Sequence, residues 1–267
     1  MPRSTYYYQE RAIKAPDPYA DLKDAILRIY NEHHRRYGYR RITAQLNNEG
    51  VMVNHKTVHK LMTQLGLRGV HPNRHYHSFR GKVGEVAPNV IDRDFVAARP
   101  LEKYTTDVTQ ICIHDVKSYL SPVLDMFNGE ILGYTISRSP DLKMVTSMLR
   151  KVFHRGETYD GLIMHSDQGW HYQHPQYQKM LKDIGIIQSM SRKGNCLDNA
   201  IMESFFGTMK NELLYLQEWD SIEQFEKALR TYIVYYNEKR IMNRLNGMSP
   251  VQYRAQYESI NNNPSNF

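Results

Sequence analysis

Apolar residues recur at helical spacing in three short stretches near the start of the chain. The first covers residues 19–33 and ends before a Tyr-Gly-Tyr turn, and the second covers residues 40–48 and stops at Gly50. A third begins behind Asn54, whose side chain suits a helix N-cap, and places its apolar residues on one face. Three short helices with a tight turn before the last predict a helix-turn-helix arrangement.

The pattern changes to strands after Pro100. Segments rich in Thr, Val and Ile alternate with polar turns, and Asn128-Gly129 is a strong two-residue hairpin signal. We expect three antiparallel strands over residues 105–113, 119–127 and 131–136, followed by alternating helices and strands. The later elements are a helix over 141–154, a strand leading to Asp167, a helix over 175–184, a strand over 186–190 and a longer helix from about Asp198. This order predicts an α/β fold with a ribonuclease-H-like core, built as a mixed five-stranded sheet with flanking helices.

Four regions follow from these patterns. We expect a helix-turn-helix region over residues 1–70, a linker over 71–100, a catalytic core over 101–217 and a C-terminal helical extension over 218–267. The extension begins with a capping box formed by Ser221 and Gln224, and its long helix has an apolar face. That face predicts packing on the core or on a partner subunit.

Positive charge is concentrated in the first third of the chain. Residues 1–100 carry 17 Lys and Arg against 9 Asp and Glu, whereas residues 101–267 carry 18 against 19. Such asymmetry is typical of a protein in which one module binds the phosphate backbone of DNA. Within the helical region we expect Arg40, Arg41, Lys56 and Lys60 to contact DNA, although a solvated basic face on a helical bundle explains them as well.

The cysteine content, the length of the apolar runs and the phosphate-binding motifs limit the classes of protein to consider. Two cysteines, Cys112 and Cys196, do not form a disulfide framework and fit a reducing cytoplasm. No apolar run is long enough to span a membrane, and no apolar signal-peptide region follows Met1, so we expect a soluble cytoplasmic protein without a membrane partner. A Gly-rich phosphate loop is also absent, so ATP hydrolysis is not indicated.

Three carboxylates occupy positions that suit metal-dependent phosphoryl transfer. Asp107 lies in the first strand of the core, Asp167 closes the fourth, and Glu203 lies on the rim of the apolar stripe of a late helix. Two Mg²⁺ ions, or Mn²⁺ in their place, need oxygen ligands from both sides and room for a phosphate between them. Position alone leaves alternatives open, namely solvent-facing roles for Asp107 and Glu203 and a cap of the next turn for Asp167. Asp125 and Asp115 are competing candidates, to which we assign structural roles.

Several ordered motifs resemble those of a known family. They are Thr106-Asp107-Val108-Thr109, His165-Ser166-Asp167-Gln168-Gly169, Asp198-Asn199-Ala200 and Glu203-Ser204-Phe205-Phe206, with Lys210 seven residues beyond Glu203. This set resembles the DDE signature of bacterial insertion-sequence transposases of the OrfB type, relatives of retroviral integrase. The 35 residues between Asp167 and Glu203 match the spacing of that group. The resemblance implies that Asp107, Asp167 and Glu203 are catalytic metal ligands, and we expect Arg192, Lys193 and Lys210 to hold DNA phosphates nearby.

The resemblance also implies partners. The first residues look like the middle of a domain, and in this family an upstream reading frame supplies a further helix-turn-helix and a coiled coil that join this frame by frameshifting. A homo-oligomer on DNA is expected as well, because a transposase holds two element ends at once. Two rival functions stay open, namely a ribonuclease-H-type nuclease using the same carboxylates and a non-catalytic helix-turn-helix regulator.

Overall fold

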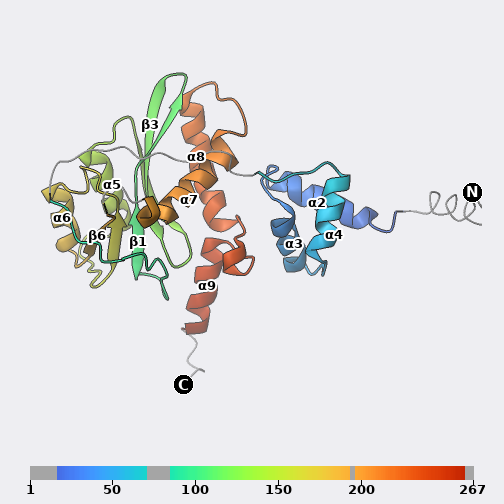
Figure 1. Cartoon of the computed structure of the whole chain (residues 1–267), viewed down its shortest axis with the longest axis horizontal. Coiled ribbons are helices and arrows are strands. Elements are labelled where there is room, and N and C mark those ends of the chain that lie inside the picture. The colour runs from blue at the N-terminus through green and yellow to red at the C-terminus, as the bar shows by residue number, and fades with distance from the viewer. Residues whose placement is uncertain (1–16, 71–84, 193–195, 262–267) are drawn as a thin grey trace, which may run out of the picture. The chain divides into compact units, whose positions relative to one another are not determined.

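The computed structural model describes residues 17–70, 85–192 and 196–261. The chain divides between Val70 and His71 into two compact units (Figure 1), which we describe separately. The first is all helical and the second contains the sheet.

Three helices form the first unit, namely α2 (Ala20–Glu32), α3 (Tyr39–Asn48) and α4 (His55–Gln64). Each begins and ends within about two residues of the predicted helix. The predicted N-cap at Asn54 is confirmed, because its side chain accepts a hydrogen bond of 2.9 Å from the backbone N–H of Lys56. Apolar side chains from all three helices are buried between them; they are Ile26, Ile29, Ile42, Leu46, Val58 and Leu61.

The second unit is built on a mixed sheet. Its strands are β1 (Lys103–Thr106), β2 (Thr109–Ile113), β3 (Val116–Asp125), β4 (Ile131–Ser137), β5 (Ile163–Ser166) and β6 (Ile187–Met190). The strands β1 and β2 both pair antiparallel with β3 in one continuous register, while β4 pairs with the other edge of β3. The strands β5 and β6 extend the sheet in parallel from β1. Because β1 and β2 lie end to end, the six segments occupy five positions across the sheet, as predicted.

The first core strand differs from its prediction at one point. Residues 105–113 were expected to form one strand, but the sheet is interrupted at Asp107 and Val108. The Asp107 carboxylate accepts a hydrogen bond of 2.6 Å from the backbone N–H of Val108. A short polar side chain that bonds to its neighbouring backbone competes with the sheet ladder, so the strand breaks where the acidic residue stands.

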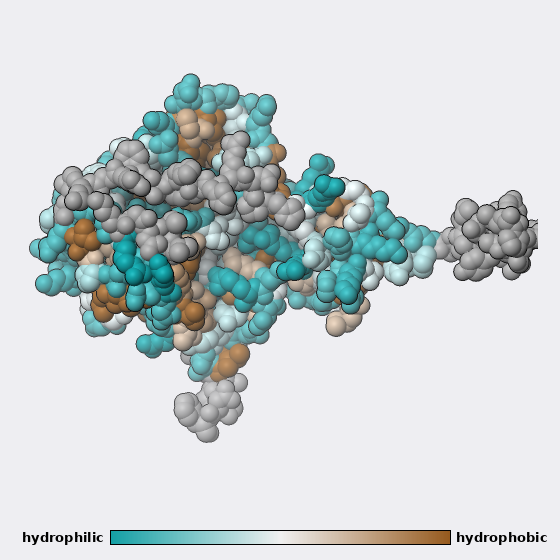
Figure 2. Space-filling model, in the orientation of Figure 1, coloured by the Kyte–Doolittle hydropathy of each residue, from teal (hydrophilic) through white to brown (hydrophobic). Residues whose placement is uncertain are grey.

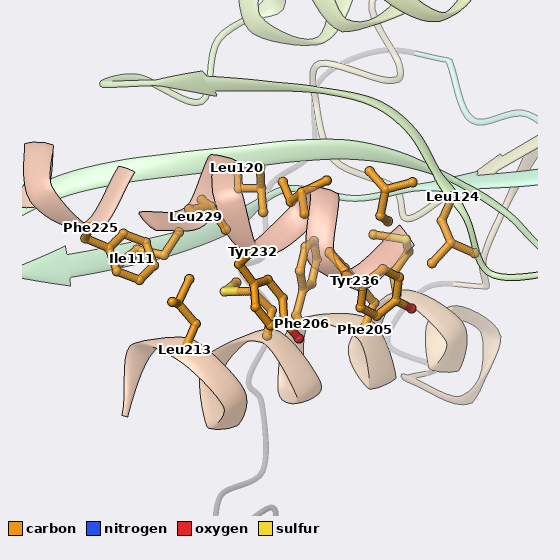
Figure 3. Close-up of a cluster of buried hydrophobic side chains, with 14 of the residues drawn as sticks. Ile111, Leu120, Leu124, Phe205, Phe206, Leu213, Phe225, Leu229, Tyr232 and Tyr236 are labelled. Carbon is orange, nitrogen blue, oxygen red and sulfur yellow. The ribbon is translucent and has the colours of Figure 1, made fainter. Parts of the chain in front are cut away.

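Helices cover both faces of the sheet. The helices α5 (Leu142–Val152) and α6 (Pro175–Lys182) pack on one face, where their apolar side chains meet Val123 and Met164. The opposite face is covered by α7 (Ala200–Met209), by the π-helical turn η2 (Lys210–Leu214) and by α8 (Ile222–Glu238). Figure 3 shows this second core, in which side chains of α8 lie between the sheet and α7. Its labelled members are Ile111, Leu120, Leu124, Phe205, Phe206, Leu213, Phe225, Leu229, Tyr232 and Tyr236.

The C-terminal helices and the segment before β1 both pack on the core. The apolar face of the C-terminal helix was predicted to pack either on the core or on a partner subunit. In the structure, this face of α8 packs on the sheet of the core. The chain then passes through η3 (Asn243–Leu245) to α9 (Pro250–Asn261). Of the predicted linker, residues 71–84 lie outside the described part of the chain, and residues 85–100 run against the sheet. Here Ile91 and Ala97 are buried with Met126.

The visible surface of both units is mostly hydrophilic, with apolar residues in small groups (Figure 2). Among the described residues, no helix combines the length and apolar character needed to cross a lipid bilayer.

Candidate active site

Two of the predicted metal ligands follow adjacent parallel strands. In the β1–β5 pair, Thr105 lies opposite His165, so two residues later Asp107 and Asp167 leave their strands side by side. Neighbouring strands are about 4.8 Å apart. The carboxyl ends of parallel strands are also where α/β sheets usually bind ligands. The fold therefore brings together two carboxylates that lie far apart in the sequence.

Local hydrogen bonds orient both side chains. One oxygen of Asp107 accepts from Val108, and the other accepts a bond of 2.8 Å from the side-chain amide of Asn199. Asp167 accepts a bond of 2.8 Å from the backbone N–H of Gly169. A Cβ at Gly169 would lie 2.9 Å from the Asp167 carboxylate and 3.0 Å from the ring of His171. A larger residue at this position would therefore displace the Asp167 carboxylate or the His171 ring.

The third carboxylate comes from the first turn of α7. A short 3-10 helix, η1 (Cys196–Asn199), precedes α7, so the late helix begins two residues after its predicted start. The predicted core stripe is confirmed, since Met202, Phe206, Met209 and Leu213 are all buried. Glu203 is half-buried on the rim of that stripe, as expected, and open space surrounds Gly207 one turn later.

The charges of Asp167 and Glu203 both act on Asp107. Burial, followed by the charges of Asp167 and Glu203, raises the pKa of Asp107 well above its usual range. Burial also raises the pKa of Asp167 and of Glu203. Like charges held together in a buried site disfavour ionisation, and a nearby cation reverses that effect. The site therefore has the electrostatic character of one that binds positive charge.

The donor set suits a hard divalent cation. All three groups offer carboxylate oxygens, which Mg²⁺ and Mn²⁺ prefer, and no sulfur or ring nitrogen is required. In the described part of the chain, no three His, Cys, Asp or Glu side chains lie close enough together to hold one ion. The charge of Glu203 nevertheless influences Asp107 through space.

Of the three predicted phosphate-binding residues near the carboxylates, Lys210 lies at the site. Burial lowers the pKa of its half-buried ammonium group, while the nearby charge of Asp107 raises it. Arg192 is about half exposed and forms ion pairs with Asp198 and Asp92. Lys193 lies outside the described residues. The charge of Lys210 therefore acts on Asp107, and Arg192 is paired with acidic side chains.

The predicted DNA-contacting residues of the first unit lie around α3 and α4. Arg40, Lys56 and Lys60 are exposed, and Arg41 is half-buried with its guanidinium 5.6 Å from the centre of the Tyr37 ring. Tyr37 itself is fully buried and stacks on His33. The aromatic residues between the arginines therefore serve the packing of this unit.

Two further residues near the carboxylates were not assigned a role in the predicted site. The side-chain amide of Asn199 donates to Asp107, and the oxygen of the same amide is buried without a partner in the described structure. His171 is buried near Asp167, and neither of its ring nitrogens has a partner among the described residues. Burial lowers the pKa of His171 to about 4, so the ring is neutral at physiological pH. His171 was not selected from the sequence, because a histidine between two aromatic residues is typical of ordinary packing, and its ring does contact Trp170 and Tyr172.

Asp125 lies opposite Tyr104 on β3, at the other end of β1 from Asp107. It is buried, and one of its oxygens accepts a hydrogen bond of 2.9 Å from the backbone N–H of Phe127. Burial raises the pKa of Asp125 to about 6. Asp115 lies in the turn between β2 and β3 with a left-handed backbone (φ of 66°). Neither residue is within the strand-end site.

The buried Asp125 leads to a stability prediction. In the unfolded chain an Asp titrates near pH ~3.9, so the folded state binds this proton more tightly and is progressively destabilised as pH rises from about 4 through 6. Asp125→Asn should therefore be about 1–3 kcal/mol more stable than the wild type at pH 7.5, with the difference vanishing near pH 4. Urea denaturation of both proteins across this range measures it. Asp115→Asn, which replaces an exposed carboxylate in the β2–β3 turn, is the control. A stability difference for Asp125→Asn that does not change with pH would contradict the prediction.

Comparison with known proteins identifies the family to which the chain belongs. The family model described as an HTH-like domain matches residues 18–75, and models described as integrase core domains match residues 97–196 and 203–257. The chain is 49% identical to the putative transposase InsK for insertion sequence element IS150 of Escherichia coli (strain K12), over 96% of this chain and 90% of that protein. The chain belongs to the insertion-sequence transposases. The predicted family and the predicted α/β fold are thereby confirmed.

Other relatives extend this picture. The transposase for insertion sequence element IS904 of Lactococcus lactis is 35% identical over 87% of this chain and 92% of that protein. The probable transposase for insertion sequence element IS1353 of Shigella flexneri is 37% identical over 95% of this chain but only 50% of that longer protein. Among solved structures, the HTLV-2 integrase catalytic core domain in complex with magnesium is 17% identical, with a TM-score of 0.42, and the match covers 59% of this chain and 98% of that one.

Proposed function

We propose that this transposase cleaves DNA at the ends of its element and transfers the exposed 3′-hydroxyl to another phosphodiester, using Asp107, Asp167 and Glu203 as metal ligands. The observation that carries the proposal is the arrival of Asp107 and Asp167 at the carboxyl ends of adjacent parallel strands. The charges of Asp167 and Glu203, which both act on Asp107, support it. So does membership of a family of transposases.

Each residue has a defined part in this mechanism. Asp107 and Asp167 form one side of the ion site, Asn199 and Gly169 orient them, and Glu203 supplies the other side from α7. Two Mg²⁺ or Mn²⁺ ions, when bound, supply the charge that activates the attacking oxygen and stabilises the leaving oxygen. We expect Lys210 to hold a DNA phosphate, and the electrostatic influence of Asp107 on its ammonium group supports this role. The contacts of Arg192 and Lys193 with DNA phosphates remain predictions.

The decisive experiment separates this function from its two rivals. The chain is incubated with labelled double-stranded DNA of an element end, with Mg²⁺, with Mn²⁺ and with EDTA. Joined DNA products that require the metal support a transposase. Cut DNA without joining under both metals would favour the nuclease, and binding without any cut would favour the regulator.

Two partners belong to the proposal. A second copy of the chain on DNA is needed to hold two element ends, and an upstream protein or fusion would supply further DNA-binding parts. The Shigella flexneri relative supports the proposal of an additional protein or fusion, because this chain matches only half of the length of that relative. Repeating the joining reaction with the upstream-frame product, separately and as a fusion, tests whether this chain acts alone.

DNA binding by the first unit gives a further prediction. We expect Arg40, Lys56 and Lys60 each to neutralise a DNA phosphate. Their replacement by Ala should weaken binding and reduce the slope of log affinity against log salt by about 0.9 per lost contact. Fluorescence anisotropy with element-end DNA over a range of salt concentrations measures the slope. Arg28→Ala is the control, because Arg28 is already paired with Glu32 and Glu49 on this unit. An unchanged slope in the triple variant would assign the DNA contact to another surface.

A further inference from the structure

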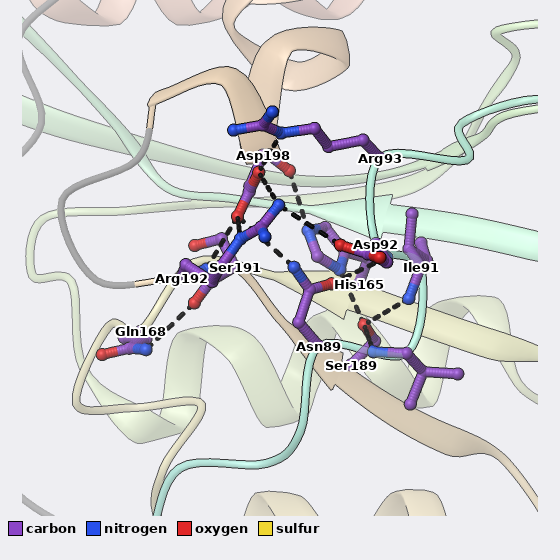
Figure 4. A network of polar contacts seen from close by, with 11 residues as sticks. Asn89, Ile91, Asp92, Arg93, His165, Gln168, Ser189, Ser191, Arg192 and Asp198 are labelled. Carbon is purple, nitrogen blue, oxygen red and sulfur yellow. Dashed lines mark hydrogen bonds and ion pairs between the residues drawn. The ribbon is translucent and has the colours of Figure 1, made fainter.

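The side chain of Asp198 is the centre of a polar network beside the carboxylates (Figure 4). It is only 1% exposed, and its two oxygens accept hydrogen bonds from three residues. Arg192 donates from its backbone N–H and its Nε at 3.0 Å each, Arg93 donates from Nε at 3.1 Å, and Asn89 donates from Nδ2 at 3.3 Å. Two guanidinium groups from different segments thus hold one buried carboxylate.

The backbone of Asp198 is held by a second set of bonds. Its carbonyl oxygen lies 2.8 Å from Nε2 of His165, whose Nδ1 lies 2.9 Å from the hydroxyl of Ser189. The Ser189 oxygen already accepts from the backbone N–H groups of Val90 and Ile91. Its proton therefore donates to Nδ1 of His165, which leaves the ring proton on Nε2 to donate to Asp198. The histidine is therefore held in one tautomer between Ser189 of β6 and Asp198 of η1.

The next residue, Asn199, reaches the acidic site. Its amide donates to one oxygen of Asp107, while the backbone N–H of Val108 donates to the other. The carbonyl oxygen of Asn199 is buried without a partner, so no bond of its own fixes the amide except the one to Asp107. The orientation of Asn199 therefore depends on the peptide that Asp198 anchors.

We propose that Asp198 is a positioning residue for the metal site: clamped by Arg192, Arg93 and His165, it holds Asn199 on Asp107 and so fixes that carboxylate for the ion. Asp198 does not touch the reacting atoms and acts through Asn199. The clamp also joins residues 89–93 to the start of α7, so three segments distant in sequence set one ligand. This inference rests on the proposed metal-binding function of Asp107.

The test is Mn²⁺ binding by the full chain, followed by electron paramagnetic resonance of the free ion. Residues that orient metal ligands typically contribute about 10–100-fold to metal affinity. We expect Asp198→Asn to weaken the tightest Mn²⁺ site by about this factor. Glu212→Gln is the matched control, since Glu212 is also a buried carboxylate with a bidentate arginine partner. It should lose stability and keep the affinity of the wild type for Mn²⁺.

Combining two substitutions tests whether Asp198 acts on metal binding through Asn199. Asn199→Ala should weaken Mn²⁺ binding about as much as Asp198→Asn, and combining them should add little further loss. Wild-type affinity in a folded Asp198→Asn chain, or fully additive losses in the double variant, would overturn the proposal. Should Asp198→Asn fail to fold, Arg93→Met removes one clamp and leaves the ion pair with Arg192; it should weaken binding severalfold, and an unchanged affinity would overturn the proposal. Asp107→Asn tests the metal site separately from the role of Asp198. Unchanged Mn²⁺ binding by this variant would refute the metal site itself.

Discussion

Replacing Glu203 with Gln is expected to slow strand transfer by about 10³-fold or more, because the ions held by the carboxylates contribute several kcal/mol of charge stabilisation and each ~1.4 kcal/mol is a tenfold change in rate. Gln keeps the size and helical preference of Glu but removes the anionic ligand. Glu203 is half-buried on the rim of α7, so the fold should tolerate the change. The measurement is the single-turnover rate of joined product from labelled element-end DNA.

The control for this prediction is an acidic residue of similar chemistry elsewhere in the same unit. Glu223 is exposed on α8 and pairs with Arg138, so Glu223→Gln should transfer strands at the wild-type rate. DNA binding by the helix-turn-helix unit should be unchanged in both variants. A Glu203→Gln protein that joins DNA at a rate near that of the wild type would remove Glu203 from the metal ligands.

The secondary structure followed closely from local patterns. The N-cap at Asn54 and the core stripe of α7 depend on residues close together in the sequence, and both are confirmed. A hairpin also forms where Asn128-Gly129 predicted one, but Asp125 bonds to Glu130, so the loop is longer than the two residues expected. The interruption at Asp107 did not follow, because Thr, Val and Ile on both sides favour one long strand. Only the hydrogen bond from Val108 to the carboxylate shows why the ladder stops there.

The sequence indicated which acidic residues are candidates for the site, but not how the fold brings them together. Its acidic members stand at recognisable ends of elements, but their meeting depends on the parallel register of β1 and β5. The role of Asp198 depends on Arg93 and Arg192, which approach it from a preceding segment and from the end of β6. Such long-range pairings leave no periodic signal, so an isolated Asp before a helix suggests only a cap.

The π-helical turn η2 shows the same dependence on distant residues, since sequence pattern alone indicated a continued α-helix beyond Lys210. Glu212 lies within this turn, and both of its oxygens accept bonds from Arg240, at 2.7 and 2.8 Å. Tyr232 of α8 donates to the same carboxylate. The two charged side chains are almost fully buried, so each depends on the other for compensation.

Arg240→Met is therefore expected to lower the free energy of unfolding by about 3–5 kcal/mol, because it leaves the Glu212 carboxylate buried without its cation. Urea denaturation at neutral pH, followed by circular dichroism, measures the loss. The double variant Arg240→Met with Glu212→Leu removes both charges and should recover most of the stability, since a buried ion pair replaced by apolar groups of similar volume is often neutral. A loss below about 1 kcal/mol in the single variant would mean that the pair behaves like a surface salt bridge. Recovery in the double variant would show that the charge of Glu212, rather than the packing of Arg240, ties the segment after α7 to the end of α8.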